Sequence, residues 1–291
     1  MKVHLNAKII SAYGGYNHII ELYHRIKNSS DNDIEISFFK TTWFEANLAA
    51  VLGAIIELLE SEGKSISIIE VNNPNTKDIL KRNGFLVDYG EESISQRQQT
   101  IISYKKFNPN ADNEFINYIK NELLSKPDFP KHSVLLGKRI NENIFELYEN
   151  ARTHGRCQKI HTCGQYYPNK KRLDITIVDM GRTIKNNVNE YLKTDMSSSS
   201  AIQWALKYGN TTKTGNISGG LGLSIIMEFI KLNQGKIQII SSDGFWEYLR
   251  GETQTNILSN YFPGTIANIE FNLDDEKSYK LKKEISLDNI F

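Results

Sequence analysis

The sequence contains few of the residues that mark specialised protein classes. Only two of its 291 residues are cysteine and six are proline, which excludes a disulfide scaffold and a proline-rich chain. With 35 basic and 34 acidic residues, the charge total gives no sign of nucleic-acid binding. The longest apolar stretch, NLAAVLGAIIELL, is too short to span a membrane, and no signal peptide precedes it. We therefore expect a cytoplasmic protein with neither a membrane segment nor a nucleic-acid partner.

The segment FELYENARTHG has the composition of a helix with a functional face. Glu146 and Asn150 are four residues apart with no glycine or proline between them, so both side chains fall on one helical face. An Asn oxygen suits Mg²⁺, and a carboxylate one turn earlier suits a water that attacks phosphorus. Such a pair alone also fits an ordinary solvated helix face, so its interpretation depends on the rest of the chain.

A second motif follows in RLDITIVDMG. The alternation of apolar and polar residues predicts a strand that ends at Asp179, with Gly181 in the turn after it. A carboxylate held there is able to accept a hydrogen bond from an exocyclic amine such as that of adenine, and Gly181 permits close approach of a flat ring. An ordinary Asx-type turn explains the same residues.

A glycine cluster forms the third motif, at Gly219, Gly220 and Gly222. The helical pattern LSIIMEFIKL comes directly after it, which indicates a helix N-terminus suited to phosphate. The cluster is neither a Walker A loop, because no Gly-Lys-Ser/Thr follows, nor a Rossmann fingerprint, because no strand precedes it.

In this order the motifs resemble the GHKL ATPases, which include sensor histidine kinases, anti-sigma-factor kinases and type II topoisomerases. The resemblance covers residues 130–273 and implies a Bergerat-type ATP-binding α/β sandwich. The matching segments are Glu146-Leu-Tyr-Glu-Asn150-Ala, Asp179-Met-Gly181, Gly219-Gly-Leu-Gly222-Leu and Pro263-Gly264-Thr265.

The resemblance implies a role for each matching residue. Asn150 would bind Mg²⁺, Glu146 would act as general base, and Asp179, supported by Thr265 through water, would accept from adenine N6. Residues 182–218 would form a lid over the nucleotide. The residues that would surround the phosphates are Gly219, Gly220, Leu221 and Gly222, with Lys213 either reaching a γ-phosphate or lying solvated in its loop.

One residue departs from the family pattern. Thr183 stands where the family often has a second glycine after Asp-x-Gly, which predicts a stiffer start to the lid. Arg182 before it is expected either to approach phosphate or to be exposed. This departure places hydrolysis in doubt more than nucleotide binding.

A zinc site is a further possibility to weigh, because His154, Cys157, His161 and Cys163 are zinc-ligand types. The segment KIHTCGQYYP alternates like a strand, however, and so separates His161 and Cys163 from His154 at the helix end. We expect no zinc site.

The first hundred residues alternate short apolar strands with helical segments and predict a small α/β domain. The stretch from IEISFF to SISIIEV resembles a STAS-like domain, the fold of anti-sigma-factor antagonists. No serine stands where those antagonists are phosphorylated. Thr41 and Thr42 are expected to cap a helix starting near Phe44.

The predicted fold class is α/β (α+β), organised as a STAS-like regulatory or docking domain, a helical linker, a GHKL ATP-binding domain and a C-terminal tail. These are residues 1–108, 109–138, 139–275 and 276–291. The linker is a spacer or a homodimer contact. With ATP and Mg²⁺ as cofactors, the expected function is an ATPase switch acting on a protein partner. The alternatives are a Ser/Thr kinase for a STAS-like partner and a non-hydrolysing nucleotide-sensing scaffold.

Overall fold

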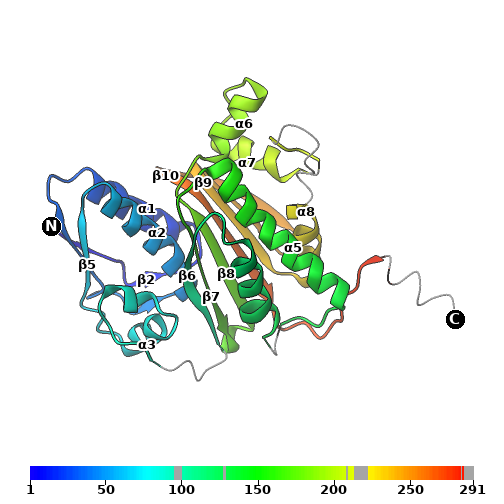
Figure 1. Cartoon of the computed structure of the whole chain (residues 1–291), viewed down its shortest axis with the longest axis horizontal. Coiled ribbons are helices and arrows are strands. Elements are labelled where there is room, and N and C mark those ends of the chain that lie inside the picture. The colour runs from blue at the N-terminus through cyan, green and yellow to red at the C-terminus, as the bar shows by residue number, and fades with distance from the viewer. Residues whose placement is uncertain (95–99, 127–128, 208, 213–221, 283, 285–291) are drawn as a thin grey trace.

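The computed structural model describes residues 1–94, 100–126, 129–207, 209–212, 222–282 and 284. Helices and sheets alternate in layers, so the fold is mixed α/β, as the sequence predicts (Figure 1). A small sheet, a helical layer, a large sheet and a second helical layer follow one another through the molecule. Within the described residues, no helix combines the length and apolarity needed to cross a membrane.

The small sheet is parallel and belongs to the N-terminal region. Its strands run in the order β1-β3-β5, and helices α1 and α2 pack between it and the large sheet. A two-residue pair, β2 with β4, lies beside it. The elements are β1 (Lys2–His4), β2 (Lys8–Ile9), α1 (Tyr13–Lys27), β3 (Asp33–Ser37), β4 (Trp43–Phe44), α2 (Ala49–Ser61), β5 (Ser65–Ile69) and α3 (Pro74–Arg82).

The start of α2 differs from the sequence prediction. The helix begins at Ala49, after a 3₁₀ turn, and not near Phe44. The hydroxyls of Thr41 and Thr42 donate to the carbonyl oxygens of Asn6 and Ala7 and do not cap the helix. Both threonines instead tie this loop to the segment between β1 and β2.

The large sheet contains five strands in the order β6-β7-β8-β10-β9, and every neighbouring pair is antiparallel. The strands are β6 (Ile101–Phe107), β7 (Ile160–Tyr167), β8 (Arg172–Asp179), β9 (Lys236–Leu249) and β10 (Glu252–Asn272). The outer half of β9 and β10 forms a hairpin that carries Trp246. β6 falls within residues 1–108, so this range contributes to both sheets.

Helices α5 and α8 pack together against the face of the large sheet that points away from α1 and α2. The helix predicted around Glu146 is the C-terminal part of α5, and Ser133 caps its start by accepting from the Leu136 N–H at 3.1 Å. The remaining helices are α4 (Asp112–Tyr118), α5 (Val134–Asn150), α6 (Ile184–Leu192), α7 (Ser198–Leu206) and α8 (Gly222–Asn233), and π-helical turns at Ile119–Leu124 and Ala151–Gly155 follow α4 and α5.

Strand β8 contacts both helical layers because its side chains point alternately to the two faces of the sheet. Ile175 and Ile177 pack with α5 and α8, whereas Asp174, Thr176 and Val178 face the layer of α1 and α2. The terminal residue of β8 therefore points to the α5 side.

A buried polar network joins the N-terminal helices to the other face of β8. The Asn47 amide donates to the hydroxyls of Ser11 and Thr176 at 2.8 and 2.9 Å and to Asn268 Oδ1 at 3.2 Å. All of these side chains are buried. Removing one partner would leave the others without hydrogen bonds, so the network fixes how the two layers meet.

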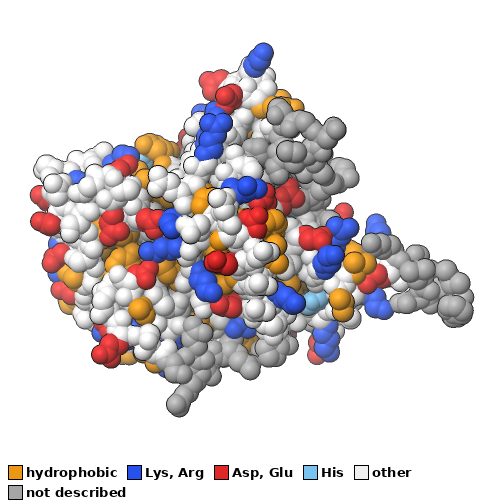
Figure 2. Space-filling view, viewed as in Figure 1, with side chains coloured by type: hydrophobic (Ala, Val, Ile, Leu, Met, Phe, Trp, Pro, Cys, Tyr) orange, Lys and Arg blue, Asp and Glu red, His pale blue; other side chains and the backbone are white. Residues whose placement is uncertain are grey.

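Charges of both signs are interspersed on the face drawn in Figure 2, and no single sign dominates it. This distribution agrees with the formal net charge of +1. That face therefore lacks the one-sided basic surface typical of nucleic-acid binding.

Candidate functional site

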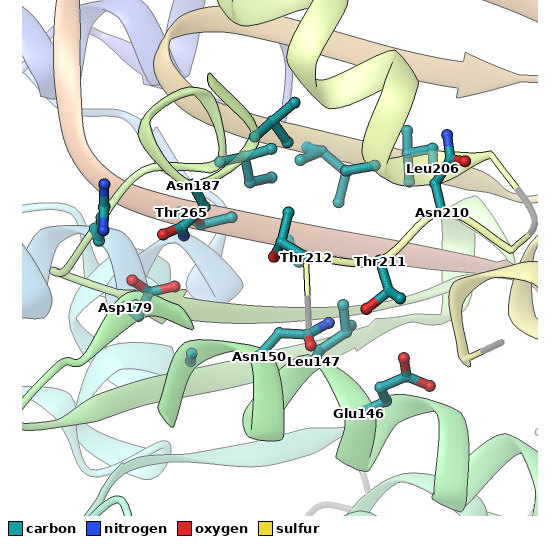
Figure 3. Close-up of a pocket in the computed structure, with 18 of the residues that line it drawn as sticks. Glu146, Leu147, Asn150, Asp179, Asn187, Leu206, Asn210, Thr211, Thr212 and Thr265 are labelled. Atoms are coloured by element: carbon teal, nitrogen blue, oxygen red, sulfur yellow. The ribbon is translucent and has the colours of Figure 1, made fainter. Parts of the chain in front are cut away.

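A cavity of about 140 Å³ opens between the C-terminal half of α5, the end of β8, the part of β10 that pairs with it, and the segment that carries α6 and α7 (Figure 3). Its walls are largely apolar, with polar groups converging at a few points. The polar residues that line it are Glu146, Asn150, Asp179, Arg182, Asn187, Asn210, Thr211, Thr212 and Thr265. An apolar cavity with a few directed polar groups is typical of small-molecule binding sites.

Asp179 provides the most unusual group in this cavity. It is the last residue of β8, and only 6% of it is exposed. Burial raises the pKa of its carboxyl group to about 8, and a hydrogen bond from the Gly181 backbone N–H only partly offsets this. Its Oδ1 has no hydrogen-bond partner among the described residues. A buried acceptor left unpaired is costly, so it favours a ligand that supplies an N–H donor.

Thr265 lies directly beside Asp179, although the two residues are far apart in the sequence. They are opposite each other in the register of β8 and β10, and both line the cavity. The Thr265 hydroxyl is 3.2 Å from the Ser241 hydroxyl, which in turn donates to the Gly264 carbonyl oxygen at 2.8 Å. This chain of groups holds the threonine in place next to the carboxylate.

Three glycines permit the close packing around Asp179. A Cβ at Gly155 would lie 2.8 Å from Asp179 Oδ1, and one at Gly264 would overlap the Asp179 carbonyl oxygen. A Cβ at Gly181 would overlap the carbonyl oxygen of Gly155, which accepts from the Arg182 N–H at 2.6 Å. The lack of a side chain at Gly181 thus makes room for the backbone of Gly155. The sequence-based expectation was that it would permit close approach of a flat ligand ring. Gly155 is not among the site residues predicted from the sequence motifs.

Glu146 and Asn150 both line the cavity from α5, as the four-residue spacing predicts. In Figure 3 they lie toward the end of the cavity opposite Asp179, with Asn150 between the other two. The site therefore has an acceptor at one end and two oxygen-bearing side chains toward the other. Thr211 and Thr212 lie across from α5 in the same view and were not identified from the sequence.

The segment after Gly181, which the resemblance predicts to be the start of a lid, begins with a helix cap. Thr183 accepts a hydrogen bond from the Asn186 N–H at 3.3 Å and so caps α6. Arg182 forms an ion pair with Glu190 of α6, so its guanidinium is held by that helix. Thr183 therefore has a local structural role as the cap of α6.

Several predicted site residues lie outside the described part of the chain. Gly219, Gly220, Leu221 and Lys213 belong to this group. Gly222 is the first residue of α8, as the helical pattern predicts.

The candidate zinc ligands are distributed over different environments. His161 Nδ1 is 3.0 Å from the Tyr104 hydroxyl, and burial lowers the pKa of this imidazole to about 3. The Asn83 amide is 3.4 Å from Cys163 Sγ, whereas Cys157 donates to the Ala151 carbonyl oxygen and packs in the other core. The described residues contain no group of three or more His, Cys, Asp or Glu side chains arranged to hold a metal.

No family model matches this chain, and no curated protein matches it significantly. Its function must therefore be judged from the chemistry of the site.

Proposed function

We propose that this protein is a cytoplasmic ATP-dependent switch of the GHKL class, whose Bergerat-type domain binds Mg²⁺·ATP in the cavity described above. The observation that carries the proposal is Asp179, whose buried Oδ1 has no partner among the described residues and belongs to a carboxyl group on the cavity wall. The antiparallel sheet with α5 and α8 on one face supports the fold assignment.

Adenine fits the end of the cavity at Asp179. Its exocyclic amine is a donor of the kind that the unpaired oxygen lacks, and Thr265 is positioned to hold a water next to it. Ile177, Val188 and Ile239 supply apolar walls for a flat ring. A volume of about 140 Å³ corresponds to about five water molecules at roughly 30 Å³ each, which a purine would displace.

The phosphates would extend toward α5. The Asn150 amide oxygen suits Mg²⁺, which prefers oxygen ligands and neutralises phosphate charge when bound. Glu146 stands one helical turn earlier on the same face, where a carboxylate is able to orient and deprotonate the attacking water. Its separation from Asn150 leaves the metal and base roles to different side chains.

The switch would act through α6 and α7, which line the cavity with Val188 and Trp204. Tyr191 and Leu192 on α6 are 47% and 36% exposed and offer a partner an apolar contact. Nucleotide occupancy that moves α6 would change the presentation of these residues, which is how ATP would control a protein–protein interaction.

The helix cap at Thr183 favours the alternative of a non-hydrolysing nucleotide-sensing scaffold. A capped helix start has less backbone freedom than a glycine hinge. The alternating strands and helices of the N-terminal layer are compatible with the STAS-like assignment, and a kinase acting on a STAS-like partner stays the other alternative.

The test follows γ-labelled ATP with Mg²⁺ on the wild-type chain. We expect bound ATP and released phosphate, with binding retained and release lost in Glu146→Gln. Asn150→Ala should lose the Mg²⁺-dependent part of binding. Inosine triphosphate, which has an oxygen in place of the exocyclic amine, should bind at least tenfold more weakly. Equal affinity for the two nucleotides would refute the role of Asp179, and label transferred to an added protein would favour the kinase.

A further inference from the structure

β5 is an edge strand of the small parallel sheet, at the outer left of Figure 1. Its Ser65 N–H donates to the Asn32 carbonyl oxygen at 2.8 Å, and its Ile69 carbonyl accepts from the residue after β3 at 3.0 Å. Since alternate residues of a strand bond to the same neighbour, Ile66 and Ile68 direct their backbone groups away from β3. No described residue forms a backbone hydrogen bond with these outward groups.

The edge lacks the features that usually prevent strand addition. The sequence SISII contains no proline and no charge, and its pairing with β3 continues without a bulge from Ser65 to Ile69. Ile66 and Ile68 are half-buried, so each keeps apolar surface that a neighbouring strand would cover. β5 is therefore a template for one more strand.

A groove of about 240 Å³ runs beside this edge. One wall is β5, and the opposite wall comes from the end of α2, the turn at residues 85–89 and β6. The residues that line it are Glu60, Ile66, Ser67, Ile68, Asp88, Tyr89 and Lys106. Because a second wall stands across from β5, the groove suits a single extended chain better than the edge of another folded copy.

The opposite wall carries an excess of negative charge. Lys106 forms ion pairs with Asp88 at 2.9 Å and with Glu57 at 3.7 Å. Glu60 is exposed at the groove and has no ion pair with any residue that the structure describes. Two carboxylates, those of Glu60 and Asp88, thus line the groove with a single ammonium group that Glu57 outside the groove also neutralises, so the groove attracts a basic side chain.

We propose that the groove beside β5 binds an extended peptide segment of a partner protein, which adds a fourth strand to the small sheet and directs a Lys or Arg toward Glu60. Backbone hydrogen bonds to Ile66 and Ile68 hold the segment, and every second side chain enters the groove. The proposal is independent of the nucleotide site.

The probe is a fluorescein-labelled peptide, Ser-Val-Thr-Lys-Thr-Val-Ser, titrated with the full chain and followed by fluorescence anisotropy. Two matched peptides carry Glu in place of Lys or N-methyl groups on alternate backbone nitrogens. We expect binding of the Lys peptide, at least tenfold weaker binding of the Glu peptide, and no binding of the methylated peptide. The Glu60→Gln variant should lose most of the preference for Lys.

Ile68→Pro removes one outward N–H but keeps the hydrogen bonds to β3, because the residues on either side of position 68 form them. The control Ile68→Val keeps the outward N–H. We expect at least tenfold weaker binding only in the proline variant, with circular dichroism confirming that both are folded. If the proline variant does not fold, the methylated peptide decides alone. The proposal would be overturned if the methylated peptide bound as well as the Lys peptide, or if the Lys peptide did not bind at millimolar concentration. It would also be overturned if the chain self-associated and Ile68→Pro abolished that self-association.

Discussion

Adenosine binding should depend on the protonation of Asp179. Burial raises the pKa of its carboxyl group to about 8 in the ligand-free protein, and the proposed bond from the adenine amine requires an acceptor. The ionised form is the stronger acceptor, so a ligand that donates to it stabilises the carboxylate and lowers this pKa. Binding should consequently release a proton and strengthen as the pH rises.

The size of the effect follows from the pKa. At pH 7, one unit below a pKa of about 8, roughly one molecule in ten carries the carboxylate. If the bound state requires that form, the dissociation constant should fall about tenfold between pH 7 and pH 9, which corresponds to about 1.4 kcal/mol.

The assay is isothermal titration calorimetry of adenosine, which lacks the titrating phosphates of ATP. Titrations in two buffers of different ionisation enthalpy report the protons released. We expect close to one proton at pH 7 and almost none at pH 9 in the wild-type chain. Asp179→Asn keeps the shape and an acceptor oxygen but does not titrate, so its affinity should be independent of pH. A wild-type affinity that is constant across this range, or a pH dependence that persists in Asp179→Asn, would refute the reasoning.

Three further predictions concern stability. Asp179 keeps its proton up to a pKa of about 8 in the folded chain but loses it near 3.8 when unfolded. The free energy of unfolding should therefore fall as the pH rises between these values, by up to about 1.4 kcal/mol per pH unit. Asp179→Asn should lose this slope in denaturant titrations. Gly181→Ala should lower the unfolding free energy by roughly 1–3 kcal/mol because its Cβ would overlap a backbone oxygen. The control Gly14→Ala, in open space on α1, should raise the unfolding free energy by up to about 1 kcal/mol. Equal melting temperatures for the two variants would contradict the expected difference. Asn47→Ala should lower the unfolding free energy measured in urea by roughly 2–4 kcal/mol through the loss of three buried hydrogen bonds. The control Asn75→Ala, at an exposed position, should lower it by less than about 1 kcal/mol. A similarly small change in both variants would show that the polar network around Asn47 adds little stability.

Local sequence patterns were sufficient to predict the elements around the site. The alternation in RLDITIVD predicted β8 and its end at Asp179, because alternate side chains of that strand are sorted to two faces. The spacing of Glu146 and Asn150 predicted their common face on α5 for the same kind of reason.

Features that depend on contacts between distant segments could not be predicted in this way. Nothing in the sequence around Gly155 indicates that its carbonyl oxygen packs against Gly181, because the contact joins the end of α5 to the turn after β8. The helix-capping role predicted for Thr41 and Thr42 was wrong because the segment between β1 and β2 offers their hydroxyls carbonyl oxygens instead. The pairing of β6 with β7 likewise crosses the expected boundary at residue 108.

The sequence by itself determined the periodicity of its helices and strands and the types of functional group that each one carries, because these depend on neighbours a few residues away. The tertiary structure decided which of those groups share an environment. It placed Thr265 opposite Asp179 through the pairing of β8 with β10, and it buried the Asp179 carboxyl group until its pKa rose to about 8. Burial and the absence of a partner are properties of the surroundings, so the free energy that an unpaired oxygen offers to a ligand arises only when the chain folds.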